Sequence, residues 1–206
     1  MNFDITKTRA GENYLTEPEE KQLFSYLKQL KIPQAERDYV LLKVARLLGL
    51  RRVEVSRLNV GDVYGKTTLI IDERIAAKGA TGKLAIPVEL NTLLVWFMRW
   101  KRDQGQSLAE DAPLFVSRTG GRLSLRAINN IMSKWLKASG VKHHVTFHGL
   151  RHSKAQRIMH DDRYLTPTQQ KNALLLANKQ LRHKSLNSTM IYAAPNREDM
   201  ATVAGL

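Results

Sequence analysis

Arginine, lysine, histidine and tyrosine side chains can together move a phosphoryl group. A tyrosine hydroxyl, with an ordinary pKa of about 10, is a weak nucleophile at neutral pH, and a phosphodiester is already an anion. Positive side chains must offset both problems, and guanidinium groups suit this task because their fork matches two phosphate oxygens. The chain carries one candidate set of these residue types: Arg51, Lys78, His148, Arg151, His183 and Tyr192.

Each candidate has an ordinary structural explanation when it is taken alone. His148 and Arg151 lie three residues apart, which places both on one face of a helix and lets both reach a single phosphate. A histidine beside an arginine is nevertheless often a structural hydrogen bonder, and a helical tyrosine usually packs its ring. Two neighbouring cations compete for the same roles: Arg52 with Arg51, and Lys83 with Lys78.

Basic residues outnumber acidic ones by 33 to 19, which gives a formal net charge of +14 and a pI near 10.1. Between Ala112 and Arg197 the only acids are Asp161 and Asp162, against fifteen lysines and arginines. This pattern indicates double-stranded DNA as the partner and the C-terminal half as the DNA-facing half. Ribosomal and membrane-surface proteins are also basic, so charge alone names no activity. The scarcity of carboxylates in this stretch argues against a two-metal nuclease.

Length and composition indicate one domain in a reducing compartment. The chain of 206 residues can bury a core, and we expect a flexible N-terminal lead over residues 1–14 and a domain over residues 15–206. Cysteine is absent, which excludes disulfides and thiolate metal sites. The first residues lack the apolar segment of a signal peptide, and Leu90–Trp100 is too short to span a membrane. We therefore expect a cytoplasmic protein that does not enter membranes.

Helix signals begin directly after the lead. Thr16 and Glu19 have the spacing of a capping box, and leucines follow at helical spacing, which predicts a helix start. Glu36–Leu48 is predicted to form a second helix that ends at Gly49. This arrangement places Arg51 at a junction between helices, near a rigid end.

Two short segments rich in β-branched residues, Thr67–Ile71 and Leu84–Pro87, flank a glycine-bounded stretch that contains Lys78 and Lys83. The pattern predicts a small antiparallel hairpin with lysines at its tip. Helical periodicity marks the later segments: residues 90–97, 124–136, 148–159, 168–181 and 188–192. The predicted fold class is therefore mainly α with a small antiparallel β-hairpin.

Four segments, in their order along the chain, resemble the signature of the tyrosine recombinase (phage integrase) family. They are Gly49–Glu54, Lys78–Gly79 with Leu84–Pro87, Thr146–Ser153, and Leu181–Leu186 followed by Ile191–Tyr192. The first resembles the family's first arginine box, the second its hairpin lysine segment, the third its His-x-x-Arg box, and the last its final box with the nucleophile. The resemblance covers about residues 15–194.

The resemblance implies the tyrosine recombinase catalytic-domain fold and a site-specific recombinase that cuts and rejoins DNA through a 3′-phosphotyrosine intermediate. It makes Tyr192 the nucleophile and Glu54 a supporting acid, with no metal and no nucleotide cofactor. Lys78 would protonate the leaving 5′ oxygen, His148 would accept or relay the tyrosine proton, and His183 would donate to a phosphate oxygen. The implied catalytic set is Arg51, Lys78, His148, Arg151, His183 and Tyr192.

Three features depart from the family pattern. The lysine segment is one residue longer than usual, and Arg182 stands where the family usually has a glycine before His183. Family members also commonly carry an N-terminal helical DNA-binding domain ahead of the catalytic part. In size the chain resembles the short members of the family that consist of the catalytic domain, such as the fimbrial phase-variation invertases.

Recombination requires four coordinated strand cuts, so the implied assembly is a homotetramer on DNA. The tail ends with Met200, Val203 and Leu206 at roughly helical spacing, an apolar face that would dock either on a neighbouring subunit or on its own core. Accessory DNA-bending proteins and association with the nucleoid are further expectations. Two other interpretations use the same residues: a type IB topoisomerase that relaxes DNA, and a DNA-binding protein of the same fold that has lost its chemistry.

Overall fold

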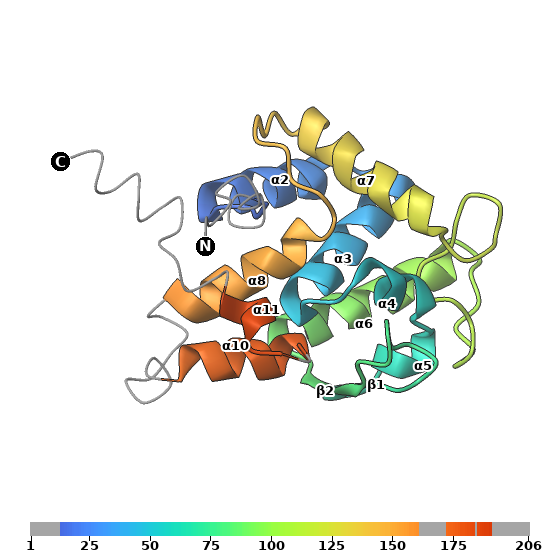
Figure 1. Ribbon diagram of the computed structural model, residues 1–206. Coiled ribbons are helices and arrows are strands. Elements are labelled where there is room, and N and C mark those ends of the chain that lie inside the picture. The colour runs from blue at the N-terminus through green and yellow to red at the C-terminus, as the bar shows by residue number, and fades with distance from the viewer. Residues whose placement is uncertain (1–12, 161–171, 184, 191–206) are drawn as a thin grey trace.

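A computed structural model describes residues 13–160, 172–183 and 185–190 of the chain. The predicted nucleophile Tyr192 and the predicted tail face lie outside these residues. Within them, helices form most of the structure and one two-stranded antiparallel sheet lies at its edge, so the predicted fold class is confirmed (Figure 1). The elements are α2 (Glu17–Gln29), α3 (Pro33–Leu48), α4 (Arg52–Arg57), α5 (Val60–Val63), β1 (Thr68–Ile71), β2 (Gly82–Ala85), α6 (Val88–Asp103), α7 (Leu125–Ala138), α8 (Gly149–His160), α10 (Ala173–Leu181) and α11 (Asn187–Met190).

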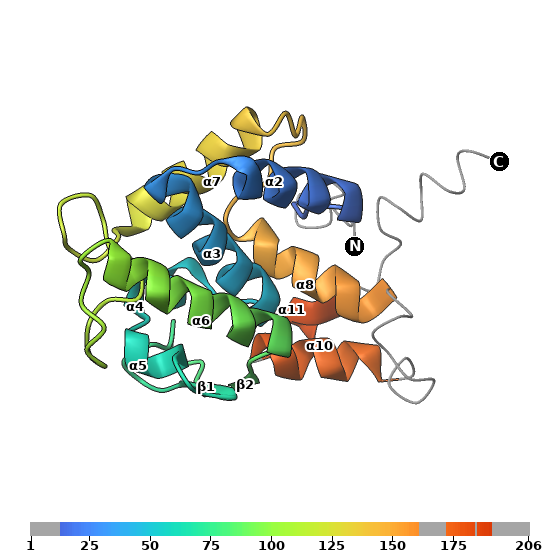
Figure 2. The same ribbon diagram turned by 180° about the vertical axis from the view of Figure 1, so that it is seen from behind.

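Helix α3 runs through the middle of the molecule, with α2, α6 and α8 packed around it (Figures 1 and 2). Pro33 is its first residue, where a missing N–H costs nothing. Apolar residues on several sides of the helix are buried, among them Val40, Leu41, Leu42 and Val44. A helix that is apolar on more than one face must lie in the core, and α3 therefore serves as the frame on which the other helices pack.

Helix α2 begins with the predicted capping box. The Thr16 side chain accepts a hydrogen bond from the backbone of Glu19, whose carboxylate accepts one from the backbone N–H of Thr16. Such a cap contributes about 1 kcal/mol to helix stability. The helix buries Leu23, Phe24 and Leu27 against α3.

Gly49 ends α3 in a left-handed conformation with φ 64°, as predicted. A side chain at this position would clash, because a Cβ would lie 2.9 Å from the Cδ atom of Lys154 on α8. The close approach of α8 and the sharp turn both require glycine. The chain then enters α4 with Arg51 as its N-cap residue, so the predicted helix junction is confirmed.

The hairpin differs from the prediction at its edges. Strands β1 and β2 pair in antiparallel register, with Ile71 opposite Gly82, and bury Leu69 and Leu84. Strand β2 begins two residues earlier than predicted, so Lys83 lies within the strand and is not at the tip. The segment before β1 is also helical from Val60 to Val63, because the Asp62 carboxylate accepts the backbone N–H of Asn59 and starts a turn there.

Residues 13 and 14 belong to the predicted lead, yet both are held against the domain. Tyr14 is 1% exposed, and Asn13 exchanges hydrogen bonds with the backbone and side chain of Thr146. The division of the chain into a lead and a domain otherwise stays a prediction. No helix among the described residues is long and apolar enough to cross a membrane.

Candidate active site

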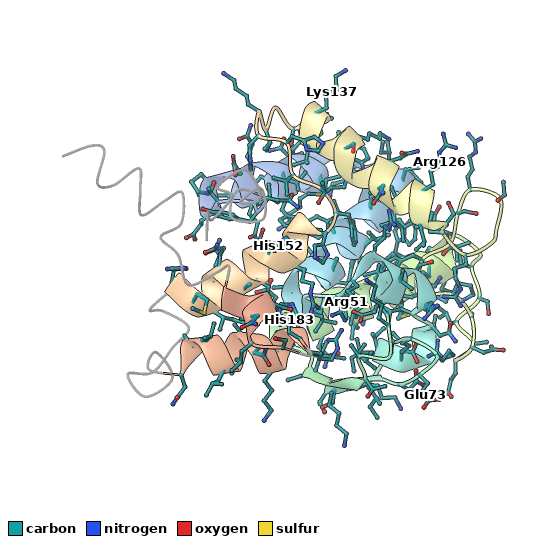
Figure 3. The ribbon with its side chains drawn as sticks, viewed as in Figure 1. Arg51, Glu73, Arg126, Lys137, His152 and His183 are labelled. Atoms are coloured by element: carbon teal, nitrogen blue, oxygen red, sulfur yellow. The ribbon has the colours of Figure 1, made fainter. Side chains whose placement is uncertain are left out.

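An open pocket of about 960 Å³ lies between α4, the β1–β2 connection, α8 and the segment after α10. Five of the six predicted catalytic residues line it, although they come from parts of the chain up to 132 positions apart. Figure 3 shows Arg51 and His183 near the centre of the molecule, below α8, which carries His152. The lining includes Arg51, Lys78, His148, Arg151 and His183. The sixth residue, Tyr192, lies outside the described part of the chain.

Arg51 reaches the pocket from the N-terminus of α4 and is fixed by Glu54. The guanidinium Nη1 lies 3.2 Å from Glu54 Oε1, and the Arg51 backbone N–H donates to Oε2 at 2.8 Å. Arg52 lines the same pocket, so proximity alone does not separate the two arginines. The ion pair with Glu54 favours Arg51 over Arg52 as the phosphate-binding residue, because it fixes the orientation of the Arg51 guanidinium.

Glu54 is fully buried and shared by two arginines. Arg182 Nη2 contacts its Oε2 at 2.6 Å, whereas the guanidinium of Arg51 contacts its Oε1. Burial alone would raise the pKa of Glu54, but the nearby charges and hydrogen bonds of Arg182 and Arg51 outweigh it and lower that pKa below its usual value. The predicted supporting acid is therefore an ionised group beneath the pocket floor.

Arg151 is 1% exposed and links two helix ends while it lines the pocket. Its Nη1 donates to the carbonyl of Gly49 at 2.6 Å, and its Nη2 donates to the carbonyl of Leu181. These carbonyls lie at the C-terminal ends of α3 and α10, where the helix dipole favours a cation. Both terminal nitrogens have protein partners, so Arg151 brings to the pocket chiefly its positive charge and a fixed position.

The histidines around the pocket are held neutral. Burial of part of the ring, together with the charges of Arg151 and Arg51, lowers the pKa of His148 to about 4, although the residue keeps solvent exposure along the pocket. Burial and the same two arginines also lower the pKa of His183 to about 4. His152 packs edge-on against His148 with ring centroids 4.6 Å apart, and burial first, then the proximity of His148 and Arg151, lowers its pKa to about 3. A neutral imidazole can accept a proton, which is the role predicted for His148.

A short hydrogen-bond chain fixes the orientation of His183. Asn178 Nδ2 donates to Thr189 Oγ1 at 3.1 Å, and the same oxygen lies 2.8 Å from His183 Nδ1. Thr189 is fully buried, and buried hydroxyl groups form hydrogen bonds. Because its oxygen accepts from Asn178, its one proton can be donated to His183 Nδ1. We assign the proton of the neutral ring to Nε2 on this basis. A ring in that tautomer can donate to a phosphate oxygen without carrying a charge.

Lys78 lies at the first central position of a tight turn. Lys78 and Gly79 have φ values of 55° and 65°, and the backbone N–H of Ala80 donates to the carbonyl of Ala77 at 3.3 Å. The Lys78 side chain is exposed and lines the pocket. Lys83, its predicted competitor, is not among the described residues that line this pocket. Its place in the pocket lining therefore favours Lys78 over Lys83 as the predicted general acid.

Sequence reasoning did not find four residues that support the site. His152, Asn178 and Thr189 lie within or beside the matched boxes but gave no signal of their own. Arg57 lines the pocket, and its Nη1 donates to the Ala76 carbonyl at 2.8 Å, which fixes the segment before Lys78. Arg57 lies three residues after Glu54, about one turn along α4. This spacing is the sequence signal that could have placed Arg57 on the same side of the helix as Glu54. In the described part of the chain, no three histidine or carboxylate side chains are grouped to hold a metal ion.

This chain is similar to known recombinases in sequence and in fold. The model of the phage integrase family matches residues 13–199, and the chain belongs to this family. The tyrosine recombinase XerC of Vibrio vulnificus strain YJ016 is 28% identical over 172 residues, which cover 83% of this chain and 50% of that protein. XerC of Neisseria meningitidis serogroup C is 30% identical over 160 residues, which cover 78% and 48%.

Solved structures show the same fold at low sequence identity. The XerA recombinase superposes with a TM-score of 0.66 at 20% identity, covering 93% of this chain and 62% of that one. XerH bound to its difH substrate gives a TM-score of 0.70 at 18% identity, covering 93% and 53%. The predicted catalytic-domain fold is confirmed. The chain spans about half the length of the curated relatives that it matches.

Proposed function

We propose that this chain is the catalytic part of a site-specific recombinase that cuts and rejoins double-stranded DNA through a 3′-phosphotyrosine at Tyr192. One observation carries the proposal: five residues chosen from separate sequence boxes line one pocket. The family membership and the DNA-bound structure of XerH support it. The narrower resemblance to fimbrial invertases stays a prediction.

The proposed reaction starts with attack of the Tyr192 hydroxyl on the scissile phosphorus. The bond from phosphorus to the tyrosine oxygen forms, the bond to the 5′ oxygen breaks, and the DNA 3′ phosphate becomes esterified to the protein. His148, neutral at pH 7, accepts or relays the tyrosine proton. Lys78 donates a proton to the leaving 5′ oxygen, which departs as a hydroxyl.

Charge that develops on the phosphate oxygens would be offset by the cations around the pocket. Arg51 and Nε2–H of His183 would donate to the non-bridging oxygens, while Arg151 adds a buried positive charge. Loss of one such donor commonly costs about 10²- to 10³-fold in rate. Because the ester preserves the bond energy, a 5′ hydroxyl from another strand can reverse the step without ATP, and we propose that no metal ion takes part.

The proposal extends to assembly and location. Coordinated cutting of four strands favours a homotetramer on DNA, with a tail contact between subunits. Accessory DNA-bending proteins would help bring two sites together. We place the protein in the cytoplasm, on the nucleoid, where its substrate lies. These points rest on the proposed reaction and on the net charge of +14.

A duplex with a nick near the scissile phosphate tests the reaction. Cleavage releases a short fragment that carries the 5′ hydroxyl, and once this fragment diffuses away the strand cannot be rejoined, so the covalent intermediate accumulates. The native site would be sought in DNA that flanks the gene. We expect a covalent adduct on denaturing gels with the unchanged protein and none with Tyr192→Phe. Tyr64→Phe is the matched control, since Tyr64 is exposed and lies outside the pocket lining. An adduct that persists in Tyr192→Phe would refute the nucleophile.

Two other outcomes would redirect the proposal. Relaxation of supercoiled plasmids without dependence on sequence would indicate a type IB topoisomerase. Sequence-specific DNA binding with no adduct under any substrate design would indicate a DNA-binding protein without chemistry. The recombinase proposal requires both adduct formation and dependence on the DNA site.

A further inference from the structure

Arg182, which stands where the family usually has glycine, has a left-handed backbone with φ 53° and ψ 46°. A residue with a side chain pays about 1–2 kcal/mol for this conformation, whereas glycine adopts it freely. Arg182 ends α10 and directly precedes His183. Arginine at this position therefore makes the backbone conformation less favourable than glycine would. Any stabilisation that arginine provides must come from the contacts of its side chain.

The Arg182 side chain is buried and joins two other segments of the site. The residue is 9% exposed; its Nη2 pairs with Glu54 Oε2 at 2.6 Å, and its Nε donates to the carbonyl of Ala80 at 3.3 Å. The side-chain stem crosses β2 at Gly82, where a Cβ would lie 2.8 Å from the arginine Cδ. Glycine at position 82 makes room for arginine at 182. One guanidinium thus connects α4, the hairpin and the end of α10.

The turn that carries Lys78 is held from both sides by arginines. Arg57 donates to the Ala76 carbonyl, two residues before Lys78, and Arg182 donates to the Ala80 carbonyl, two residues after it. Both positions are backbone carbonyls, so the contacts fix the path of the turn whatever its side chains do. The Lys78 side chain itself remains exposed on the pocket wall.

We propose that Arg182 is a positioning residue for Lys78. By anchoring the Ala80 carbonyl to the ionised Glu54 under the pocket floor, it holds the lysine turn where the ammonium group can reach the leaving 5′ oxygen. This inference rests on the proposed function, in which Lys78 is the general acid. Arg182 does not touch the reacting atoms; it acts through the turn.

Two simpler roles for Arg182 predict different defects. If it only closes α10 and stabilises the fold, its loss lowers stability and affects every substrate equally. If it acts through Glu54 on Arg51, its loss weakens the phosphate clamp, again on every substrate. The positioning role predicts a defect confined to substrates whose leaving group needs a proton.

A substrate with sulfur in place of the bridging 5′ oxygen at the scissile phosphate separates these roles. A thiol has a pKa of about 8.5, so the thiolate leaves without a general acid, whereas an alkoxide needs a proton. Single-turnover cleavage would be measured on the oxygen and sulfur substrates. The variants are Arg182→Gly, Lys78→Ala and Arg51→Ala. Lys179→Ala is the matched control, since it removes an exposed positive charge from α10.

We expect Arg182→Gly to cleave the oxygen substrate roughly 10- to 100-fold more slowly, a part of the 10²- to 10⁴-fold that a general acid contributes. The sulfur substrate should restore Arg182→Gly and Lys78→Ala to nearly the unchanged rate. Arg51→Ala should be slow on both substrates, and Lys179→Ala normal on both. Arg182→Lys, which cannot make the same fork, should fall between Arg182→Gly and the unchanged protein.

Several results would overturn the inference. Equal slowing of Arg182→Gly on both substrates would assign Arg182 to the clamp or to the fold, and no slowing on either would leave it without a role. Failure of sulfur to rescue Lys78→Ala would remove Lys78 as the acid and the inference with it. If the unchanged protein forms no adduct, the proposed function fails instead. A urea unfolding curve of Arg182→Gly would verify that the variant is folded.

Discussion

Two buried carboxylates, Asp38 in the helical frame and Glu54 beneath the pocket, differ in the state that their surroundings favour. Asp38 accepts a hydrogen bond from Trp135 Nε1 at 2.8 Å and pins α7 to α3, and burial raises its pKa above the usual value despite the neighbouring Arg37. Glu54 is buried as deeply, yet its pKa is lowered because two arginines share it. Asp38 pairs with one arginine, Arg37, and with a tryptophan N–H, whereas Glu54 is paired with two arginines.

The same contrast holds for the buried cations. Lys101 lies in the frame, where its Nζ donates to the carbonyls of Pro113 and Leu114 and to Gln106, and burial lowers its pKa to about 8. It holds a loop in place and meets no carboxylate among these partners. Arg151 also donates to carbonyls, but it does so beside the pocket, where its charge adds to the effect of burial in lowering the pKa values of His148 and His183. Buried charge near the pocket therefore shapes an electrostatic field as well as a fold.

The largest effect expected from this contrast is on the two carboxylates themselves. Glu54→Gln leaves Arg182 buried without its counter-ion, which should cost about 3–5 kcal/mol of unfolding free energy. Asp38→Asn keeps an oxygen for the Trp135 N–H but loses the ion pair with Arg37, and should cost about 1–3 kcal/mol. Urea unfolding at pH 7 measures both. An equal or larger loss in Asp38→Asn would contradict the view that the charge of Glu54, shared by two arginines, contributes more to stability than the charge of Asp38.

A comparison of two arginines separates catalysis from stability. Arg51→Ala should slow cleavage by about 10²- to 10³-fold while the fold persists. Arg37→Ala should do the reverse, because Arg37 donates to Asp38 and to the Val116 carbonyl in the frame. It should lower the unfolding free energy by about 1–3 kcal/mol and leave the rate nearly unchanged. Single-turnover cleavage and urea unfolding would be measured on both variants, and loss of rate in Arg37→Ala at full folding would break the comparison.

The smallest effect is the pH dependence that the neutral histidines impose. An unfolded histidine gains its proton near pH 6.5, whereas His152 in the folded protein does so near 3, because burial and the neighbouring charges disfavour the imidazolium. The unfolded state therefore binds more protons between these values, and stability falls as the pH drops below 6.5. His152 should account for about 1–2 kcal/mol of the loss between pH 7 and pH 5.

The histidine prediction is checked by urea unfolding at pH 7 and pH 5. His152→Gln should reduce the difference between the two pH values, while His144→Gln, an exposed control, should leave it unchanged. A pH dependence identical in all three proteins would mean that His152 is not held neutral.

Much of the frame could be predicted from local signals, and most of the pocket from the order of the four boxes that resemble the family signature. The capping box at Thr16 and the glycine stop at Gly49 are set by neighbouring residues, and both are confirmed. The ordered boxes indicated which distant residues to combine, and five of them line one pocket. The catalytic roles of these residues stay predictions.

Other features could not be read from the chain because they depend on tertiary contacts. The place of Lys83 in a strand follows from its pairing with Ile70. The helical turn at Val60–Val63 is an exception, because it depends on a local hydrogen bond from the Asn59 backbone to the Asp62 carboxylate. The support of His183 by Thr189 appears only when α10 and α11 pack together. The partners of Arg182 lie more than a hundred positions away, so the sequence showed the departure from glycine but not its use.

The most direct test of the account is a structure of the protein on duplex DNA that carries its site. The account predicts the scissile phosphate in the pocket, with Arg51 and His183 within hydrogen-bond distance of its non-bridging oxygens. The Tyr192 hydroxyl, from the same or a neighbouring subunit, should lie opposite the 5′ oxygen, which faces Lys78. A phosphate bound elsewhere, with Tyr192 far from this pocket in every subunit, would contradict the account.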